Sequence, residues 1–91
     1  MIIKGEVTKE DIKHGFVRSS SNCPIARSLG RILPDDVRVS VGKRTITIDR
    51  KVEYLISKFR IFIRRFDDDL PVKPFKYVFP TNHDYELRIK K

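Results

Sequence analysis

The apolar pattern between positions 59 and 66 constrains the fold of this chain more than any other feature. Four residues fall at i, i+3, i+4 and i+7 and so share one face of an α-helix. They are Phe59, Phe62, Ile63 and Phe66. Ser57 is placed to cap this helix, and the run from Asp67 to Pro71 ends it. A chain of 91 residues buries only about 60–65% of the surface that it exposes when unfolded, so this stripe must face a thin core.

Three β-prone runs precede this helix. Valines alternate with polar residues over 37–41, which is the period of a half-buried strand. Residues 45–48 form a second run, and apolar residues alternate again at Val52, Tyr54 and Ile56. Gly42-Lys43 and the segment 49–51 are typical of tight turns. These features predict a three-stranded antiparallel meander from about Val37 to Ile56.

Two short helices are predicted before the meander. Ile2, Ile3 and Val7 indicate an opening strand or extended arm, and Thr8-Lys9-Glu10-Asp11 resembles a capping box with Thr8 as the N-cap. We expect the helix that follows to end near Gly15, in the left-handed conformation that glycine tolerates.

The second helix is predicted to begin at Pro24, with Asn22 or Cys23 as its cap. Its apolar stripe has spacings of three and four. The stripe consists of Ile25, Leu29, Ile32 and Leu33. Arg27 and Arg31 lie four residues apart on the outer face, and Pro34 ends the helix.

The C-terminal part predicts one more strand. Phe75, Tyr77 and Phe79 alternate, and Pro74 restricts this segment to the edge of a sheet. Residues 80–91 are a polar, basic tail, or an extra edge strand because Tyr85, Leu87 and Ile89 alternate. The chain is therefore predicted to be a single α+β domain over residues 1–79. It consists of two N-terminal helices, a three-stranded antiparallel meander, a third helix and a C-terminal edge strand, with the helices on one face of the sheet.

The charge of the chain indicates a class of partner. Lysine and arginine number 20 against 12 acidic residues, a net charge of +8. This excess predicts attraction to nucleic acid, an anionic membrane surface or an acidic protein, although it also serves solubility alone. No apolar run approaches the ~18 residues of a membrane span, and the apolar N-terminal stretch is too short for a signal peptide. The protein is therefore expected to be intracellular, and a membrane is not among the partners that we predict.

The polar side of the third helix is the main candidate for a binding surface. Ile61 falls opposite the phenylalanine stripe and is surrounded by cations, as in a contact surface for a partner; a lone exposed isoleucine is the plainer interpretation. The predicted partner-binding residues here are Arg60, Ile61, Arg64 and Arg65. Arg27 and Arg31 on the second helix complete the predicted set.

No catalytic, metal or cofactor site is predicted. Cys23 has neither a nearby base nor zinc-like spacing to His14 and His83, so it is expected to be a buried structural residue. Consecutive carboxylates at Asp67, Asp68 and Asp69 do not easily converge on one ion. The serines before the second helix, with Arg18 and Arg27, are either a phosphate-binding loop or, more simply, a capping loop.

Several segments resemble a family of short, mostly uncharacterised proteins of bacteriophages, prophages and their hosts. The two most specific are the Cys-Pro-Ile-Ala helix start at 23–26 and the Phe-Asp…Pro-Val…Pro-Phe segment at 66–75. Asp69 and Leu70 stand where the resemblance leads us to expect a glycine-containing turn. The resemblance implies a phage or mobile-element origin, location in the cytoplasm of a bacterial host, and no established activity.

Charge and resemblance together predict a small non-enzymatic binding protein. By class-level analogy with small phage proteins, it is expected to engage a host protein or nucleoprotein, including a defence system, through a basic surface. The alternative is a nucleic-acid-binding accessory protein. Oligomeric state and the identity of the partner are left open.

Overall fold

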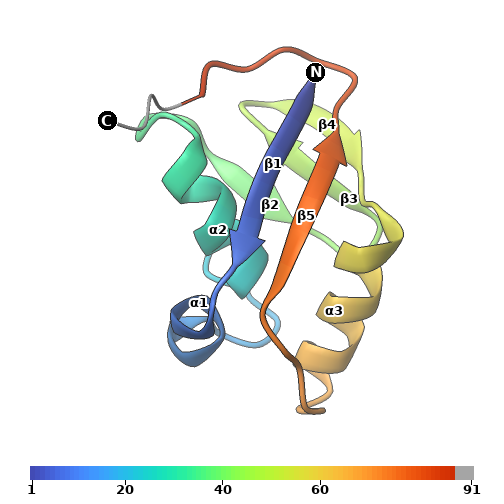
Figure 1. The fold of residues 1–91 in the computed structure, drawn as a ribbon. Coiled ribbons are helices and arrows are strands. Elements are labelled where there is room, and N and C mark those ends of the chain that lie inside the picture. Colours follow the sequence, from blue (N-terminus) through green and yellow to red (C-terminus); the bar gives the residue numbers. More distant parts are fainter. Residues whose placement is uncertain (88–91) are drawn as a thin grey trace.

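The computed structural model describes residues 1–87 of the chain, with three helices and five strands in this part (Figure 1). In chain order the elements are β1 (Ile2–Val7), α1 (Lys9–His14), α2 (Pro24–Ile32), β2 (Val39–Val41), β3 (Thr45–Ile48), β4 (Lys51–Tyr54), α3 (Ser57–Asp67) and β5 (Phe75–Pro80). The predicted α+β class is therefore confirmed. Every helix within residues 1–87 is too short or too polar to span a bilayer.

The strands form two separate antiparallel sheets. The meander β2–β3–β4 is present as predicted, and β1 pairs with β5 along its whole length, from Ile2 opposite Pro80 to Val7 opposite Phe75. The expectation that the helices cover one face of a single sheet is wrong. In Figure 1 the β1–β5 pair crosses the front of the meander, with α2 on one side and α3 on the other. The core lies between these elements because each contributes an apolar face.

Packing against β5 buries the phenylalanine stripe of α3. Phe59 is fully buried, and its ring lies 4.9 Å from that of Tyr77 and 5.2 Å from that of Phe79, both edge-on. Phe62 is also buried and contacts Phe75, with 5.1 Å between ring centroids. The predicted helix and its inward face are therefore confirmed. As a result, the polar side of α3 must face outward.

The direction of the side chains on β4 differs from the prediction. Val52 and Tyr54, expected on the apolar face, are 55% and 75% exposed, whereas Glu53 between them is 1% exposed. Both oxygens of Glu53 are satisfied by the segment that follows β5. They accept hydrogen bonds from the backbone N–H of Asn82 (2.7 Å), from His83 Nδ1 (2.8 Å) and from the Tyr85 hydroxyl (2.7 Å). These partners allow a carboxylate to take the inward position.

The same contacts place the C-terminal segment. Residues 81–87 form no strand, so the predicted extra edge strand does not extend over this part of the chain. Instead, Asn82, His83 and Tyr85 are tied to β4, and the side chain of Tyr85 is partly buried against the core. Ile89, Lys90 and Lys91 of the predicted strand or basic tail lie outside the described residues.

A buried carboxylate also joins α1 to α2. The predicted capping box is confirmed, since Thr8 Oγ1 accepts from the N–H of Asp11 and the Asp11 carboxylate accepts from the N–H of Thr8. Asp11 is fully buried and receives two hydrogen bonds from the Arg31 guanidinium, while Arg27 Nε lies 3.6 Å from it. Helical period alone places Arg27 and Arg31 on an outer face of α2. The structure corrects this, because both side chains turn towards Asp11.

Two local details differ from the expected caps and turns. Gly15 has a φ of −74° and is not left-handed; a Cβ there would lie 2.7 Å from the Asp11 carbonyl oxygen and from the Pro24 ring, so close packing is what favours glycine. Ser57 is the first residue of α3, whose N-cap is Ile56 with no side-chain hydrogen bond.

The turn after α3 has the backbone conformation expected of a glycine-containing turn. Asp69 has a φ of 57°, a conformation that favours glycine.

Candidate anion-binding cleft

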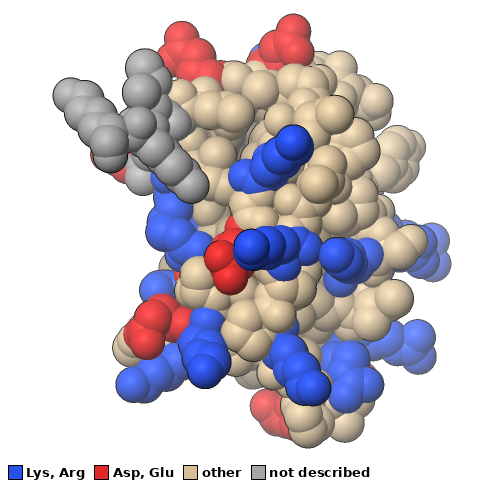
Figure 2. Space-filling view, viewed as in Figure 1, with Lys and Arg blue, Asp and Glu red and all other residues tan. Residues whose placement is uncertain are grey.

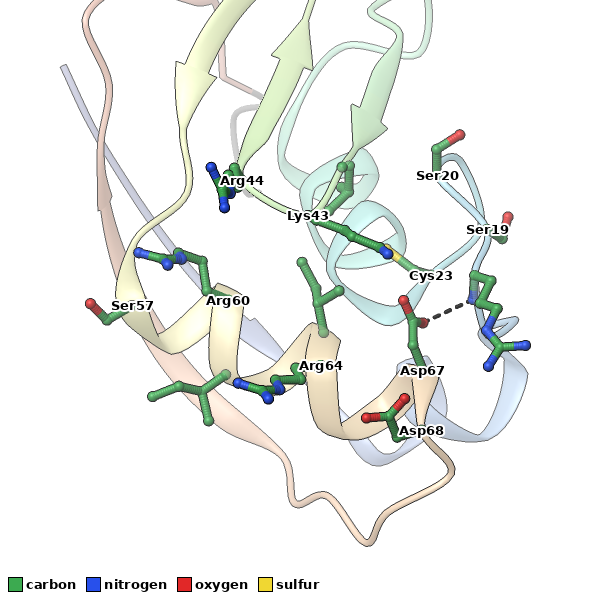
Figure 3. A pocket seen from close by; sticks show the side chains of 15 residues that line it. Ser19, Ser20, Cys23, Lys43, Arg44, Ser57, Arg60, Arg64, Asp67 and Asp68 are labelled. Atoms are coloured by element: carbon green, nitrogen blue, oxygen red, sulfur yellow. Dashed lines mark hydrogen bonds between the residues drawn. The ribbon is translucent and has the colours of Figure 1, made fainter.

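A cleft of about 880 Å³ lies between α3, the β2–β3 turn and the loop before α2 (Figure 3). α3 supplies Ser57, Arg60, Ile61, Ile63, Arg64 and Asp67. The β2–β3 turn supplies Gly42, Lys43 and Arg44, and the loop supplies Arg18, Ser19 and Ser20. Three segments distant in sequence thus meet at one hollow, because α3 packs its opposite face on β5 and leaves this side open.

The predicted cations of α3 divide between two places. Arg60 and Arg64 both line the cleft, one helical turn apart. Arg65 does not: its guanidinium donates two hydrogen bonds to the carbonyl oxygen of Pro71, at 3.2 and 3.0 Å from Nε and Nη2. Ile61 is 61% exposed and lies on the rim, between the cleft and a smaller groove that Arg65 lines. Of the predicted α3 residues, Arg60, Arg64 and Ile61 are therefore brought together.

The structure adds three cations that we did not assign to this surface. Lys43 and Arg44 sit in the β2–β3 turn, where the Gly42 N–H bonds to the Thr45 carbonyl at 2.8 Å. Arg18 lies in the loop before α2, where its backbone N–H donates to Asp67 Oδ1 at 2.8 Å. The one sequence signal for Lys43 and Arg44 is two adjacent cations in a predicted turn. Nothing in the sequence indicates that this turn faces α3.

The cleft has a cationic end and an end with acidic groups. In Figure 3 the side chains of Arg44 and Arg60 lie at one end, Arg64 lies further along α3, and Lys43 reaches from the turn across the hollow. Asp67 and Asp68 lie at the other end, on the side of the cleft that the loop before α2 forms. One Asp67 oxygen is already occupied by the loop. An anion is therefore best accommodated at the arginine end.

The cleft is electropositive for two physical reasons. Five cationic and two acidic side chains line it, and within residues 1–87 none of these five cations forms an ion pair. The positive end of the α3 dipole lies beside them, with Ser57 in the cleft wall and no side chain capping the first turn. A hollow lined by like charges with apolar walls concentrates the field and attracts an oppositely charged ligand.

Charge on the face that carries β1 and β5 is less localised than in the cleft. On the face that carries β1 and β5, Figure 2 shows Lys and Arg side chains scattered among uncharged residues, with few Asp or Glu. Arg27 and Arg31, predicted as a second binding surface, are committed in part to the buried Asp11. The net charge of +8 therefore does not by itself mark a site, whereas in the cleft five described cations without an ion-pair partner in residues 1–87 line one hollow.

The two histidines and Cys23 make local contacts with neighbouring residues. No group of three His, Cys, Asp or Glu side chains within residues 1–87 is placed to hold a metal ion. His14 Nε2 lies 3.1 Å from Glu10 and His83 Nδ1 lies 2.8 Å from Glu53, so both imidazoles pair with carboxylates. Cys23 is 6% exposed and acts as the N-cap of α2, with Sγ accepting from the N–H of Ala26. Burial raises the pKa of its thiol, which disfavours the thiolate.

Replacing Cys23 with serine is expected to leave stability within about 1 kcal/mol of the wild type. Serine is a stronger N-cap than cysteine, which offsets the loss of a slightly larger buried atom. In the wild type the buried thiol should react with an aromatic disulfide reagent more slowly than free cysteine. A faster reaction would contradict the structural role and point to nucleophilic or redox chemistry.

Comparisons with known proteins give no further guide to this site. A scan against protein-family models, a search of curated proteins and a search of solved structures each found no match.

Proposed function

We propose that this protein is a non-enzymatic binding module that holds an anionic partner in the cleft between α3 and the β2–β3 turn. One observation carries the proposal: five cations from three separate segments line one hollow, and none of them has an ion-pair partner within residues 1–87. Unpaired like charges repel one another, so the arrangement is stabilised when an anion enters.

The residues of the cleft have distinct roles in this proposal. Arg60, Arg64 and Arg44 hold anionic oxygens, since a guanidinium presents a planar fork that matches carboxylate and phosphate groups. Ile61, exposed on the rim, supplies an apolar contact that is desolvated when the partner docks. The serines of the loop offer additional donors. The resemblance to phage proteins supports a host protein or nucleoprotein as the source of the anionic surface, with direct nucleic-acid binding as the alternative.

Charge reversal in the cleft tests this proposal. The double variant Arg60→Glu/Arg64→Glu is expected to bind a heparin column at least about tenfold more weakly than the wild type and to elute at lower salt. In solution, the slope of log affinity for heparin against log salt should fall by about two, one for each lost contact. The fold should be retained, because both side chains are exposed and surface changes usually cost within ~0.5 kcal/mol.

A control with the same net charge separates the cleft from bulk charge. Lys4 and Lys9 are exposed on β1 and α1 and do not line the cleft. Their replacement by glutamate lowers the net charge from +8 to +4, as the cleft variant does. The proposal requires the cleft variant to elute well before this control. Elution of both variants at the same salt concentration would show that net charge, not the cleft, determines binding.

A further inference from the structure

The outer face of the three-stranded sheet carries an exposed aromatic ring on the strand that pairs next to Arg44 of the cleft. Tyr54 is 75% exposed, with Val52 two residues before it at 55%. Tyr54 stands opposite Thr45 on β3, and Val52 stands opposite Thr47, so one face of the sheet presents an aromatic, an aliphatic and two hydroxyl side chains. The burial of Glu53 on the other face directs Tyr54 outward, because successive side chains of a strand alternate.

The backbone that carries this ring pairs with the backbone of Arg44, a cation of the cleft. Arg44 lines the cleft and directly precedes Thr45, the pairing partner of Tyr54. The Arg44 carbonyl accepts a hydrogen bond from the N–H of Leu55, the residue after Tyr54, at 3.0 Å. The aromatic face and the arginine cluster are thus held in a fixed relation at one end of the meander.

We propose that the alternative given above, direct nucleic-acid binding, is how the cleft is used: the partner is a single strand whose phosphates occupy the arginine end of the cleft while Tyr54 stacks on one of its bases. This inference rests on the proposed function of the cleft. A positively charged groove beside an exposed aromatic ring is the combination that binds single strands, because the groove follows the backbone and the ring takes an unpaired base. An acidic protein would use the arginines but would have no aromatic base to stack on Tyr54. A duplex keeps its bases stacked and paired, so it cannot offer one.

The test measures binding of three fluorescent 12-mer probes by anisotropy: oligo-dT, oligo-U and a mixed-sequence DNA duplex. Wild-type protein is expected to bind the single strands more tightly than the duplex, and the ratio for dT and U shows whether DNA or RNA is preferred. Tyr54→Ala is expected to weaken single-strand binding by about 5- to 100-fold, the usual loss for one stacked base. Tyr54→Phe keeps the ring and should stay within about twofold of the wild type.

The heparin experiment distinguishes failure of this inference from failure of the cleft. Tyr54→Ala should elute from heparin with the wild type, because heparin has no aromatic base. If the Arg60→Glu/Arg64→Glu variant loses heparin binding but Tyr54→Ala binds oligo-dT and oligo-U as the wild type does, the cleft proposal stands and base stacking is refuted. Wild-type binding to heparin without preference for single strands over the duplex also overturns the inference, because it shows attraction to anions without base stacking. Equal heparin binding by the cleft variant and the Lys4/Lys9 control overturns both the proposed role of the cleft and the base-stacking inference.

Discussion

Replacing Phe59 with alanine is expected to lower the free energy of unfolding by about 3–5 kcal/mol, the range for a buried phenylalanine. Phe59 is fully buried, and its ring meets Phe75, Tyr77 and Phe79 on β5. Alanine removes the most deeply buried of the aromatic contacts that hold α3 against β5. Because domains of this size have a total stability of only ~5–15 kcal/mol, the variant is expected to be partly unfolded at 37 °C.

Two further variants make this result interpretable if the alanine variant does not fold. Phe59→Leu retains much of the buried volume and is expected to lose less than the alanine variant while remaining folded. Ile61→Ala removes an exposed apolar side chain from the other side of the same helix and should change stability within ~0.5 kcal/mol. Urea unfolding followed by circular dichroism measures all three. A midpoint for Phe59→Leu equal to that of Ile61→Ala would contradict the buried position of the α3 stripe.

Replacing Glu53 with glutamine is expected to cost about 2–3 kcal/mol at neutral pH, because a buried charged acceptor with three donors is replaced by a neutral group with one acceptor oxygen. The glutamine NH2 group must also face donors from which it cannot accept a hydrogen bond. Some of these donors, and the N–H groups of the amide, are then left unpaired. The segment 81–87 should then detach from β4 and become accessible to protease. Glu86→Gln, an exposed change in the same segment, is the matched control and should leave stability and cleavage unchanged.

The stability contributed by Glu53 has a defined dependence on pH. Burial on its own would raise the pKa of Glu53, but the hydrogen bonds from Asn82, Tyr85 and His83 outweigh it and lower the pKa below the ordinary value. The stabilisation is therefore present in full above the pKa of glutamate in the unfolded chain, about 4.3. It is lost as the pH falls from there through the lower pKa of Glu53 in the folded protein. Asp11 contributes in the same direction, since its pKa is also lowered: burial raises it, and the Arg31 and Thr8 hydrogen bonds exceed that effect.

Acid unfolding of the wild type and of Glu53→Gln tests whether Glu53 contributes this pH-dependent stability. Wild-type stability should decline below about pH 4.3, and Glu53→Gln should decline less steeply, with the remaining loss due to Asp11 and other carboxyls. Parallel pH profiles for the two proteins would show that Glu53 is not the acceptor for the C-terminal segment. The pKa of Tyr85 lies above its ordinary value. Burial of the hydroxyl is the larger cause, and the hydrogen bond to the Glu53 carboxylate is the second. The ultraviolet titration of that tyrosine should therefore shift to lower pH in the variant.

Local patterns in the sequence were sufficient for most of the elements and for part of the site. The spacing of Phe59 and Phe62 identified the buried face of α3, and this in turn placed Arg60 and Arg64 on the outside, where the structure finds them lining the cleft. The capping box at Thr8 and the cap at Cys23 are likewise confirmed. These features depend on residues within a few positions of one another, so helical period and capping chemistry are enough to predict them.

Other features depend on residues far apart in the chain, and only the tertiary structure decided them. The alternation over 51–56 fits either phase of a strand, and hydrogen bonds from residues 82–85 select the phase that buries Glu53 and exposes Tyr54. Helical period alone placed Arg31 outward, but a buried carboxylate on α1 draws it in. The second wall of the cleft, with Lys43 and Arg44, exists because α3 packs against β5 and lies across from the β2–β3 turn. The sequence by itself therefore determined the elements and the outward cations of α3, through local periodicity. The tertiary structure alone brought a second set of cations to face them, because charges in separate segments converge only when long-range packing places them.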